Sequence, residues 1–245
     1  TGSMLSACVA IEELARVCYN TAYLLLVQWV PFGAILHGGN EEQKQRLLPG
    51  LASGDLRGAF STTEAQSGSD VSGFRINGAK IWCTNSDLAD FVLVAAKLEQ
   101  NGKDGISLFI VERGTPGFTV GKKEDKIGAR GVPSCPLFLD DVFVHDANLI
   151  GGGFKAVMEA FNSSRPLIGA RGVGLAQGAI DHAQGFIQDR RAFGQTIAEF
   201  QGVRWMLADM AIQTEAARNL VYRAASLVDL AAPSAELAQA AAIAK

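Results

Sequence analysis

The densest group of hydrogen-bonding side chains lies in residues 60–85, which read FSTTEAQSGSDVSGFRINGAKIWCTN. Hydroxyl groups, each able to donate one hydrogen bond and accept two, recur along this segment at Ser61, Thr62, Thr63, Ser67, Ser69 and Thr84. Such a segment can hold a polar ligand, but Ser, Gly and Asp are also ordinary turn residues. Trp82, taken alone, is most simply an aromatic side chain on the face of a β-sheet. From these residues alone, ligand binding and turn formation both stay open.

A second group that could do chemistry is the charged run Asp189, Arg190 and Arg191. The planar guanidinium of Arg190 could bind two phosphate oxygens at once, because its geometry is fixed and its charge is permanent. A solvated cluster at a helix end is the simpler interpretation. The glycines of residues 151–153 lack the spacing of a dinucleotide-binding loop or a P-loop, so they favour a turn over a phosphate site.

The composition excludes several classes of protein. The chain has 245 residues, of which 48% are hydrophobic, and its 22 basic and 25 acidic residues give a net charge of −3. Because no basic run could follow a phosphate backbone, we expect no nucleic-acid partner. The cysteines are scattered without zinc-ligand spacing, which predicts reduced and mostly buried thiols and no metal site, at Cys8, Cys18, Cys83 and Cys135.

The first third of the chain has helical periodicity. Ser3 can cap a helix that runs to about Cys18, with Glu12 and Glu13 on the face opposite the apolar residues. A second, apolar helix is expected to about Leu36. Residues 23–36 are interrupted by polar, proline and glycine residues, so they predict a core helix and no membrane span. Asn40 then caps a short helix that we expect to end at residues 49–50.

After Gly54 the pattern changes to short runs of β-branched and aromatic residues, at residues 91–96, 107–111, 118–120 and 137–144. Helix returns at about Gly151, with long apolar patterns over residues 167–186 and 200–230. Strands that are segregated from helices argue against a Rossmann fold. We therefore predict an α+β protein with an N-terminal helical domain (residues 1–55), a central antiparallel β domain (56–148) and a C-terminal helical bundle (149–245).

Several motifs together resemble the acyl-CoA dehydrogenase family. The family's T-E-P-x-A-G-S-D and N-G-x-K-x-W-I-T-N segments are similar to TEAQSGSD at residues 63–70 and NGAKIWCTN at residues 77–85. Its D-R-x-x-F-G motif is similar to DRRAFG at residues 189–194, and LFLDDV at residues 137–142 extends the match. The motifs occur in the family's order along the whole chain. The resemblance implies the fold predicted above, with FAD as the cofactor.

The resemblance also implies roles for individual residues. Those expected to line the flavin ring system and its neighbouring groups are Phe60, Thr62, Thr63 and Ser69, with Trp82 beside the ring and Thr84 near N5. Ser69 and Arg165 are expected to contact the acyl-CoA substrate. Arg190 is expected to reach the FAD pyrophosphate across a subunit interface, with Phe193 and Gln201 near the adenosine. A shared cofactor of this kind implies a homotetramer built as a dimer of dimers.

The resemblance implies α,β-dehydrogenation of an acyl-CoA thioester, in which a carboxylate takes the α proton and the β hydrogen leaves as hydride to flavin N5. Electrons would pass to an electron-transfer flavoprotein. Some branched-chain members of the family carry the base at the position of Ser164, so here we expect a glutamate beyond Lys245. An oxygen-using acyl-CoA oxidase and a non-catalytic FAD-binding subunit of a heteromer are the alternatives.

The match to the family has gaps. The family's first and last helices are absent, and about one hairpin is missing between Gly73 and Phe74. We therefore expect these residues to be part of a longer chain. The resemblance places such a protein in fatty acid metabolism, in the cytoplasm of a bacterium or the mitochondrial matrix of a eukaryote, with the cytoplasm favoured.

Overall fold

The computed structural model describes residues 2–62, 64–68, 74–100, 103–151 and 153–245. Its contacts divide the chain into two compact units, which are described separately below. Unit 1 consists of Thr1–Tyr23 and Arg165–Lys245, and unit 2 consists of Leu24–Ser164. The helices α2 and α4 each contribute residues to both units.

The N-terminal helices are α1 (Met4–Val17), α2 (Tyr19–Gly38) and α3 (Glu41–Ser53). The two predicted caps are confirmed: Ser3 accepts a hydrogen bond from the Ser6 amide, and Asn40 and Gln43 form a reciprocal capping box. The predicted end of α3 at residues 49–50 is wrong. The helix continues to Gly54, whose φ of 86° makes it a left-handed C-cap.

Helix α2 does not break where the sequence predicted interruptions. It runs for 20 residues with Pro31 inside it. By length and composition it could cross a membrane, although 39% of its apolar 18-residue stretch is buried and core helices of globular proteins have the same length and composition. Its polar, proline and glycine residues therefore do not interrupt the helix, which ends at Gly38, close to the predicted end at Leu36. Packing supplies the reason, because Ala34 and Ile35 after the proline are fully buried in unit 2.

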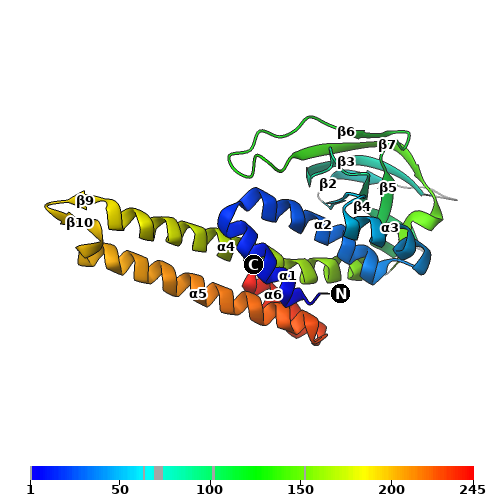
Figure 1. Ribbon diagram of the computed structural model, residues 1–245. Helices are drawn as coiled ribbons and strands as arrows, with labels where there is room; N and C mark the ends of the chain where they lie inside the picture. The colour runs from blue at the N-terminus through cyan, green and yellow to red at the C-terminus, as the bar shows by residue number, and fades with distance from the viewer. Residues whose placement is uncertain (1, 63, 69–73, 101–102, 152) are drawn as a thin grey trace. The chain divides into compact units, whose positions relative to one another are not determined.

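Unit 2 contains two four-stranded sheets (Figure 1). The first has the order β1-β4-β5-β8 and the second β2-β3-β7-β6. The strands are β1 (Gly58–Ser61), β2 (Glu64–Gly68), β3 (Phe74–Thr84), β4 (Phe91–Gln100), β5 (Lys103–Glu112), β6 (Phe118–Val120), β7 (Ser134–Val144) and β8 (Leu149–Ile150), with a 3-10 turn η1 (Asp146–Asn148) before β8. Neighbouring strands are antiparallel except β1 and β4, which are parallel. The helix–sheet–helix order and the α+β class are confirmed.

The central strand β4 is buried on both faces, which explains its nearly continuous apolar sequence. Val92 and Val94 point into a core between the two sheets, together with residues of β3 and β7 such as Ile76 and Leu137. The alternate residues of β4 pack on the other side, in a core shared with α2, α3 and the start of α4; they include Phe91, Leu93 and Ala95. The described residues of segment 60–85 thus belong to packed sheets, and most of them are in strands where the sequence suggested a loop.

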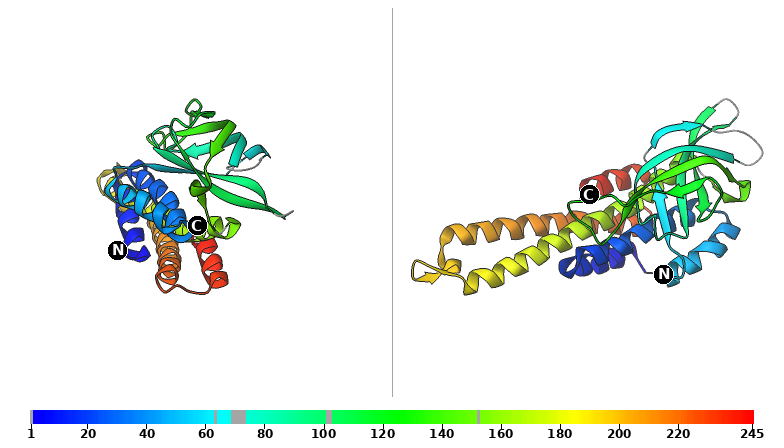
Figure 2. Two further views of the ribbon diagram at one scale, coloured as in Figure 1. Left: turned by 90° about the vertical axis from the view of Figure 1, so that its right-hand side faces the viewer. Right: turned by 90° about the horizontal axis from the view of Figure 1, so that it is seen from above.

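Unit 1 contains the C-terminal helices (Figure 2). Its elements are α4 (Gly153–Asp189), the short hairpin β9 (Arg191–Ala192) and β10 (Gln195–Thr196), a 3-10 turn η2 (Ile197–Glu199), α5 (Gln201–Asp229) and α6 (Ser234–Ala244). The hairpin reverses the chain, so that α5 returns alongside α4. Helix α1 joins them, and its first amides donate to the Asp229 carboxylate, from Met4 at 2.6 Å and from Leu5 at 3.0 Å. A side chain of α5 therefore caps α1.

Candidate functional site

The segment 60–85 brings the ends of β1 and β3 together. The Cys83 thiol donates to the Phe60 carbonyl oxygen at 3.6 Å, which joins the two strand ends within unit 2. The Phe60 ring is half-buried and packs edge-on against Phe161, with 5.5 Å between ring centroids. Thr62 follows β1 and is half-buried as well. The predicted residues Thr63 and Ser69 lie outside the described residues.

A bulge in β3 turns Trp82 outward. The register of β3 against β7 shifts between Lys80 and Cys83, so an extra residue is inserted there. Trp82 has a φ of 60° and a side chain that is 59% exposed. A positive φ in so bulky a residue is rare and costs about 1–3 kcal/mol, and such strain gathers at functional sites. The sequence predicted Trp82 as a site residue but not this conformation.

The residues after Trp82 are held in place by burial and by a backbone hydrogen bond. Cys83 is in the core between the sheets, where burial raises the pKa of its thiol to about 11. Thr84 is half-buried opposite Ser134 on β7. Asn85 has a φ of 65° and donates its amide to the Pro133 carbonyl at 2.8 Å. The two strand ends joined by the contact between Cys83 and Phe60 thus carry four of the predicted site residues, Phe60, Thr62, Trp82 and Thr84.

Two buried polar atoms at these strand ends have no hydrogen-bond partner among the described residues. They are Ser61 Oγ and Asn85 Oδ1, in side chains that belong to residues only 2% and 3% exposed. Leaving such an atom unpaired costs about 1–3 kcal/mol. A polar ligand whose edge carries donors and acceptors, such as an isoalloxazine ring, would complete their bonding. The residues present therefore fit a bound flavin, and Asn85 was missed although Asn is among the non-glycine residues that are enriched at positive φ.

The other predicted cofactor residues lie in unit 1, at the turn that follows α4. Arg190 is exposed, and its backbone closes the turn by accepting a bond from the Ile197 amide at 2.8 Å. Phe193 and Gly194 form a two-residue hairpin turn with φ values of 52° and 83°, as the type I′ turn requires. Phe193 is 97% exposed. Gln201 is also exposed, at the start of α5.

The predicted substrate residue Arg165 lies inside α4 and is half-buried, and α4 continues through Pro166 without ending. Its neighbour Ser164 is 2% exposed, and its hydroxyl donates to the Phe161 carbonyl at 3.1 Å. The Ser164 hydroxyl is therefore committed to its own helix. The proton acceptor, expected beyond Lys245, stays a prediction.

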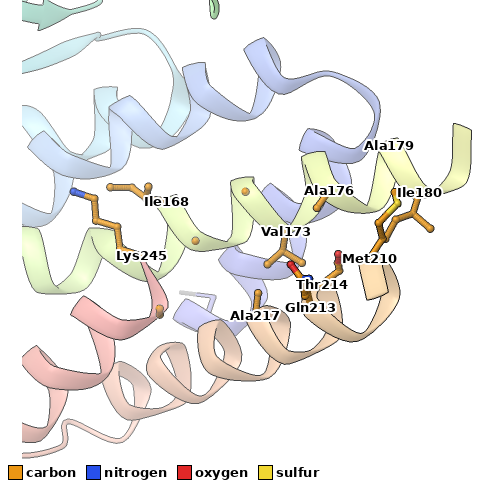
Figure 3. A pocket seen from close by; sticks show the side chains of 13 residues that line it. Ile168, Val173, Ala176, Ala179, Ile180, Met210, Gln213, Thr214, Ala217 and Lys245 are labelled. Carbon is orange, nitrogen blue, oxygen red and sulfur yellow. The ribbon is translucent and has the colours of Figure 1, made fainter. Parts of the chain in front are cut away.

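Two hollows among the described residues differ in their relation to the predicted site. A recess of about 250 Å³ in unit 2 is lined by residues of α2 and α3, including Leu25, Trp29 and Phe32. A larger hollow of about 500 Å³ lies in unit 1 between α4, α5 and the end of α6 (Figure 3). It is mostly apolar, and Gln213 and Thr214 are its main polar side chains apart from Lys245. This apolar lining does not suit a charged cofactor, and no predicted site residue belongs to it.

Comparison with known proteins gives the same family for each part of the chain. Family models match the acyl-CoA dehydrogenase N-terminal domain at residues 1–55, the middle domain at residues 57–142 and the C-terminal domain at residues 151–245. An acyl-CoA dehydrogenase of Bacillus subtilis is 43% identical over 240 residues, which are 91% of this chain and 63% of the relative. A cyclohexane-1-carbonyl-CoA dehydrogenase of Geobacter metallireducens is 38% identical over 94% of this chain and 64% of its own length.

The fold comparison covers nearly the whole chain. Butyryl-CoA dehydrogenase from Megasphaera elsdenii superposes with a TM-score of 0.93 at 36% identity, over 99% of this chain and 67% of that protein. The chain thus spans slightly less than two thirds of the curated relatives it matches, as expected for part of a longer protein. Three domain models in order, together with a shared fold, establish that the chain belongs to the acyl-CoA dehydrogenase family.

Proposed function

We propose that the full-length protein is an FAD-dependent acyl-CoA dehydrogenase that desaturates an acyl-CoA thioester between its α and β carbons. The observation that carries this proposal is the pair of joined strand ends in unit 2, where Thr62, Trp82 and Thr84 accompany two buried polar atoms without partners. Family membership supports the same activity. We further propose an electron-transfer flavoprotein as electron acceptor, a homotetrameric assembly and a cytoplasmic location.

The two threonines and Trp82 have different proposed roles. The hydroxyl groups of Thr62 and Thr84 hold the polar edge of the flavin, together with Ser69 and Thr63. Trp82, turned outward by the bulge, supplies an apolar surface beside the ring system. Fixed donors at the polar edge would favour negative charge there at little reorganisation cost. When bound, FAD supplies the acceptor for the hydride that leaves the β carbon.

The pyrophosphate and adenosine of the cofactor are assigned to a second set of residues, Arg190, Phe193 and Gln201. The exposed guanidinium of Arg190 suits phosphate because it can donate two parallel hydrogen bonds. We propose that these residues serve the cofactor of a partner subunit and that Arg165 contacts the acyl-CoA. We propose that the α proton is taken by a glutamate beyond Lys245, because the position that carries the base in some members of the family is Ser164 here.

The test uses the full-length protein loaded with FAD and mixed without oxygen with a panel of acyl-CoA thioesters. We expect at least one thioester to bleach the flavin absorbance and an electron-transfer flavoprotein to restore it. Loss of the Thr62 hydroxyl in Thr62→Ala should weaken FAD binding about three- to tenfold, the effect of one hydrogen bond. Thr119→Ala removes the same group from an exposed position on β6 and should change nothing.

Three outcomes would count against the proposal. A flavin that no thioester bleaches would exclude the dehydrogenase reaction. Peroxide formation in air at the full rate of turnover would indicate an oxidase. A chain that binds thioester and FAD but reacts only after a second, different subunit is added would indicate a non-catalytic partner in a heteromer.

A further inference from the structure

The turn between β3 and β4 in unit 2, residues 85–90, directly follows the predicted flavin residues of β3. Three of its residues, Asn85, Ser86 and Ala89, are at most 3% exposed. Within the turn, the Leu88 amide donates to the Asn85 carbonyl oxygen at 3.2 Å. Buried peptide groups need hydrogen-bond partners, so the other buried carbonyl groups of this turn need donors from elsewhere in the chain.

The guanidinium group of Arg113, directly after β5, supplies these donors. Its Nε donates to the Ala89 carbonyl oxygen at 2.7 Å, and its Nη2 donates to those of Ser86 at 3.1 Å and Asp87 at 2.6 Å. The Arg113 backbone amide also donates to the Asp90 carbonyl oxygen at 2.8 Å. A guanidinium presents its donors in a rigid planar fork, whereas the ammonium of a lysine sits on a flexible stem. Arg113 therefore holds the carbonyl groups of the turn in one arrangement.

Hydrogen bonds lead from this turn back to the joined strand ends. Ser86, one of the acceptors of Arg113, donates its hydroxyl group to the Cys83 carbonyl oxygen at 3.0 Å. The Cys83 thiol in turn donates to the Phe60 carbonyl oxygen at 3.6 Å. Asn85, with its φ of 65°, lies between Cys83 and Ser86 in the sequence. Arg113 is thus connected, through Ser86 and Cys83, to the strand ends that carry the predicted flavin residues.

The turn has a conformation that is costly by itself. Asn85 combines a positive φ with a buried Oδ1 that has no partner among the described residues. Asp87 Oδ1 is in the same condition, although Asp87 Oδ2 pairs with Lys123 at 2.7 Å. Such strain and such unpaired atoms persist only where the surrounding contacts enforce them. The three side-chain bonds of Arg113 are contacts of this kind, so without them we expect the turn to relax and Thr84 and Asn85 to move with it.

We propose that Arg113 is a positioning residue for the flavin, which holds residues 85–90 so that Thr84 and Asn85 face the polar edge of the ring system. This inference rests on the proposed function, because it needs a flavin at the strand ends of unit 2. Arg113 acts through the turn and not by contact with the flavin. A Thr84 hydroxyl held at that edge stabilises negative charge on the reduced ring. Loss of Arg113 should therefore weaken FAD binding and lower the reduction potential of the bound flavin.

The test uses the full-length protein and measures the dissociation constant of FAD and the reduction potential of the bound flavin, below the Tm of every variant. Arg113→Ala should weaken FAD binding about tenfold or more, the effect of losing hydrogen bonds from a charged donor, and should make the potential more negative. Arg113→Lys keeps the charge without the planar fork and should weaken binding about threefold. Arg57→Ala is the matched control, because Arg57 is exposed in unit 2 and bonds to Asp90 through its backbone. It should change neither value.

Hydrogen exchange of the same proteins reports the turn itself. The Asn85 amide donates to the Pro133 carbonyl oxygen at 2.8 Å, and the Leu88 amide closes the turn. Both amides should exchange faster in Arg113→Ala than in the wild type. Faster exchange or a lower Tm with wild-type FAD affinity and potential would make Arg113 a structural residue only and overturn the inference.

Other outcomes separate this inference from the proposed function. Equal weakening of FAD binding by Arg57→Ala would trace the effect to surface charge and overturn the positioning role. If Arg113→Ala does not fold, wild-type affinity in Arg113→Lys overturns it. If Arg113→Ala loosens FAD as expected but no thioester bleaches the wild-type flavin, dehydrogenation fails and the positioning role stands. A wild-type protein that binds no FAD overturns both.

Discussion

At the scale of single residues, a buried charge network holds unit 1 together. Glu12 is 5% exposed, although its place on the polar side of the helical pattern predicted an exposed carboxylate. Its two oxygens accept from Arg218 Nε and the Tyr222 hydroxyl, while Arg218 also donates to Gln177 at 2.8 Å. Burial, followed by the nearby Glu12, raises the pKa of Tyr222 to about 12. Three helices, α1, α4 and α5, meet in this network.

We predict that Glu12→Ala lowers the free energy of unfolding by about 3 kcal/mol, because it leaves Arg218 Nε and the Tyr222 hydroxyl without their acceptor. Glu13→Ala is the matched control. Glu13 is exposed and lies 3.6 Å from Arg16, so its loss should change stability by less than about 0.5 kcal/mol. Urea unfolding followed by circular dichroism measures both. Equal effects of the two substitutions would show that Glu12 is not a buried partner.

At the scale of elements, glycines set the distance between α1 and α4. A Cβ at Gly174 would lie 2.1 Å from the Glu12 carbonyl oxygen, and one at Gly178 would lie 2.3 Å from that of Arg16. Real Cβ atoms do not approach backbone this closely, so the helices can pack at this distance only with glycine at both positions. The two glycines are four residues apart and therefore lie on one face of α4. The helical pattern alone did not distinguish them from other small residues.

We predict that Gly174→Ala destabilises the protein by about 1–3 kcal/mol, the usual cost of forcing extra volume into a packed contact. Gly185→Ala, in the same helix, meets no atom within 4 Å and should stabilise the protein by about 0.5–1 kcal/mol through helix propensity. Thermal unfolding measures both effects, and we expect the Tm to fall in Gly174→Ala and to rise in Gly185→Ala. A gain of stability in Gly174→Ala would contradict the close packing of α1 on α4.

At the scale of the whole molecule, unit 1 exposes large apolar side chains on and after the β9–β10 hairpin. They include Phe193 at 97%, Ile212 at 67%, Met206 at 64% and Trp205 at 63%. Large apolar side chains that are exposed in this way are typical of surfaces that contact another surface. This supports the proposed homotetramer, in which Arg190 and Phe193 serve a neighbouring subunit.

We predict that the full-length protein sediments as a tetramer and that Phe193→Ser both weakens this assembly and lowers FAD affinity, by about tenfold or more. Phe143→Ser, on β7, serves as the control because Phe143 is 39% exposed and belongs to unit 2. Analytical ultracentrifugation reports the assembly, and the ratio of flavin to protein absorbance reports the cofactor. A Phe193→Ser protein that stays tetrameric with full FAD would remove Phe193 from the interface.

Side-chain type and periodicity predicted which helices and strands form better than they predicted where these end. The caps at Ser3 and Asn40 and the strand at residues 118–120 appear where side-chain type and alternation predicted them. The helix end predicted from Pro49 is wrong, because burial of the neighbouring Leu47 and Leu51 outweighs the local penalty of proline. The roles assigned to Thr63 and Ser69 stay predictions.

The sequence by itself determined the family, the helix–sheet–helix order and the residues to expect around a flavin, because these depend on motifs and local periodicity. Only the tertiary structure revealed the outward turn of Trp82, the unpaired Asn85 oxygen and the burial of Glu12. It alone placed the Arg113 guanidinium against three carbonyl oxygens of one turn. Strain, unpaired polar atoms and burial arise when segments far apart in the chain meet, and no local pattern records which segments will meet.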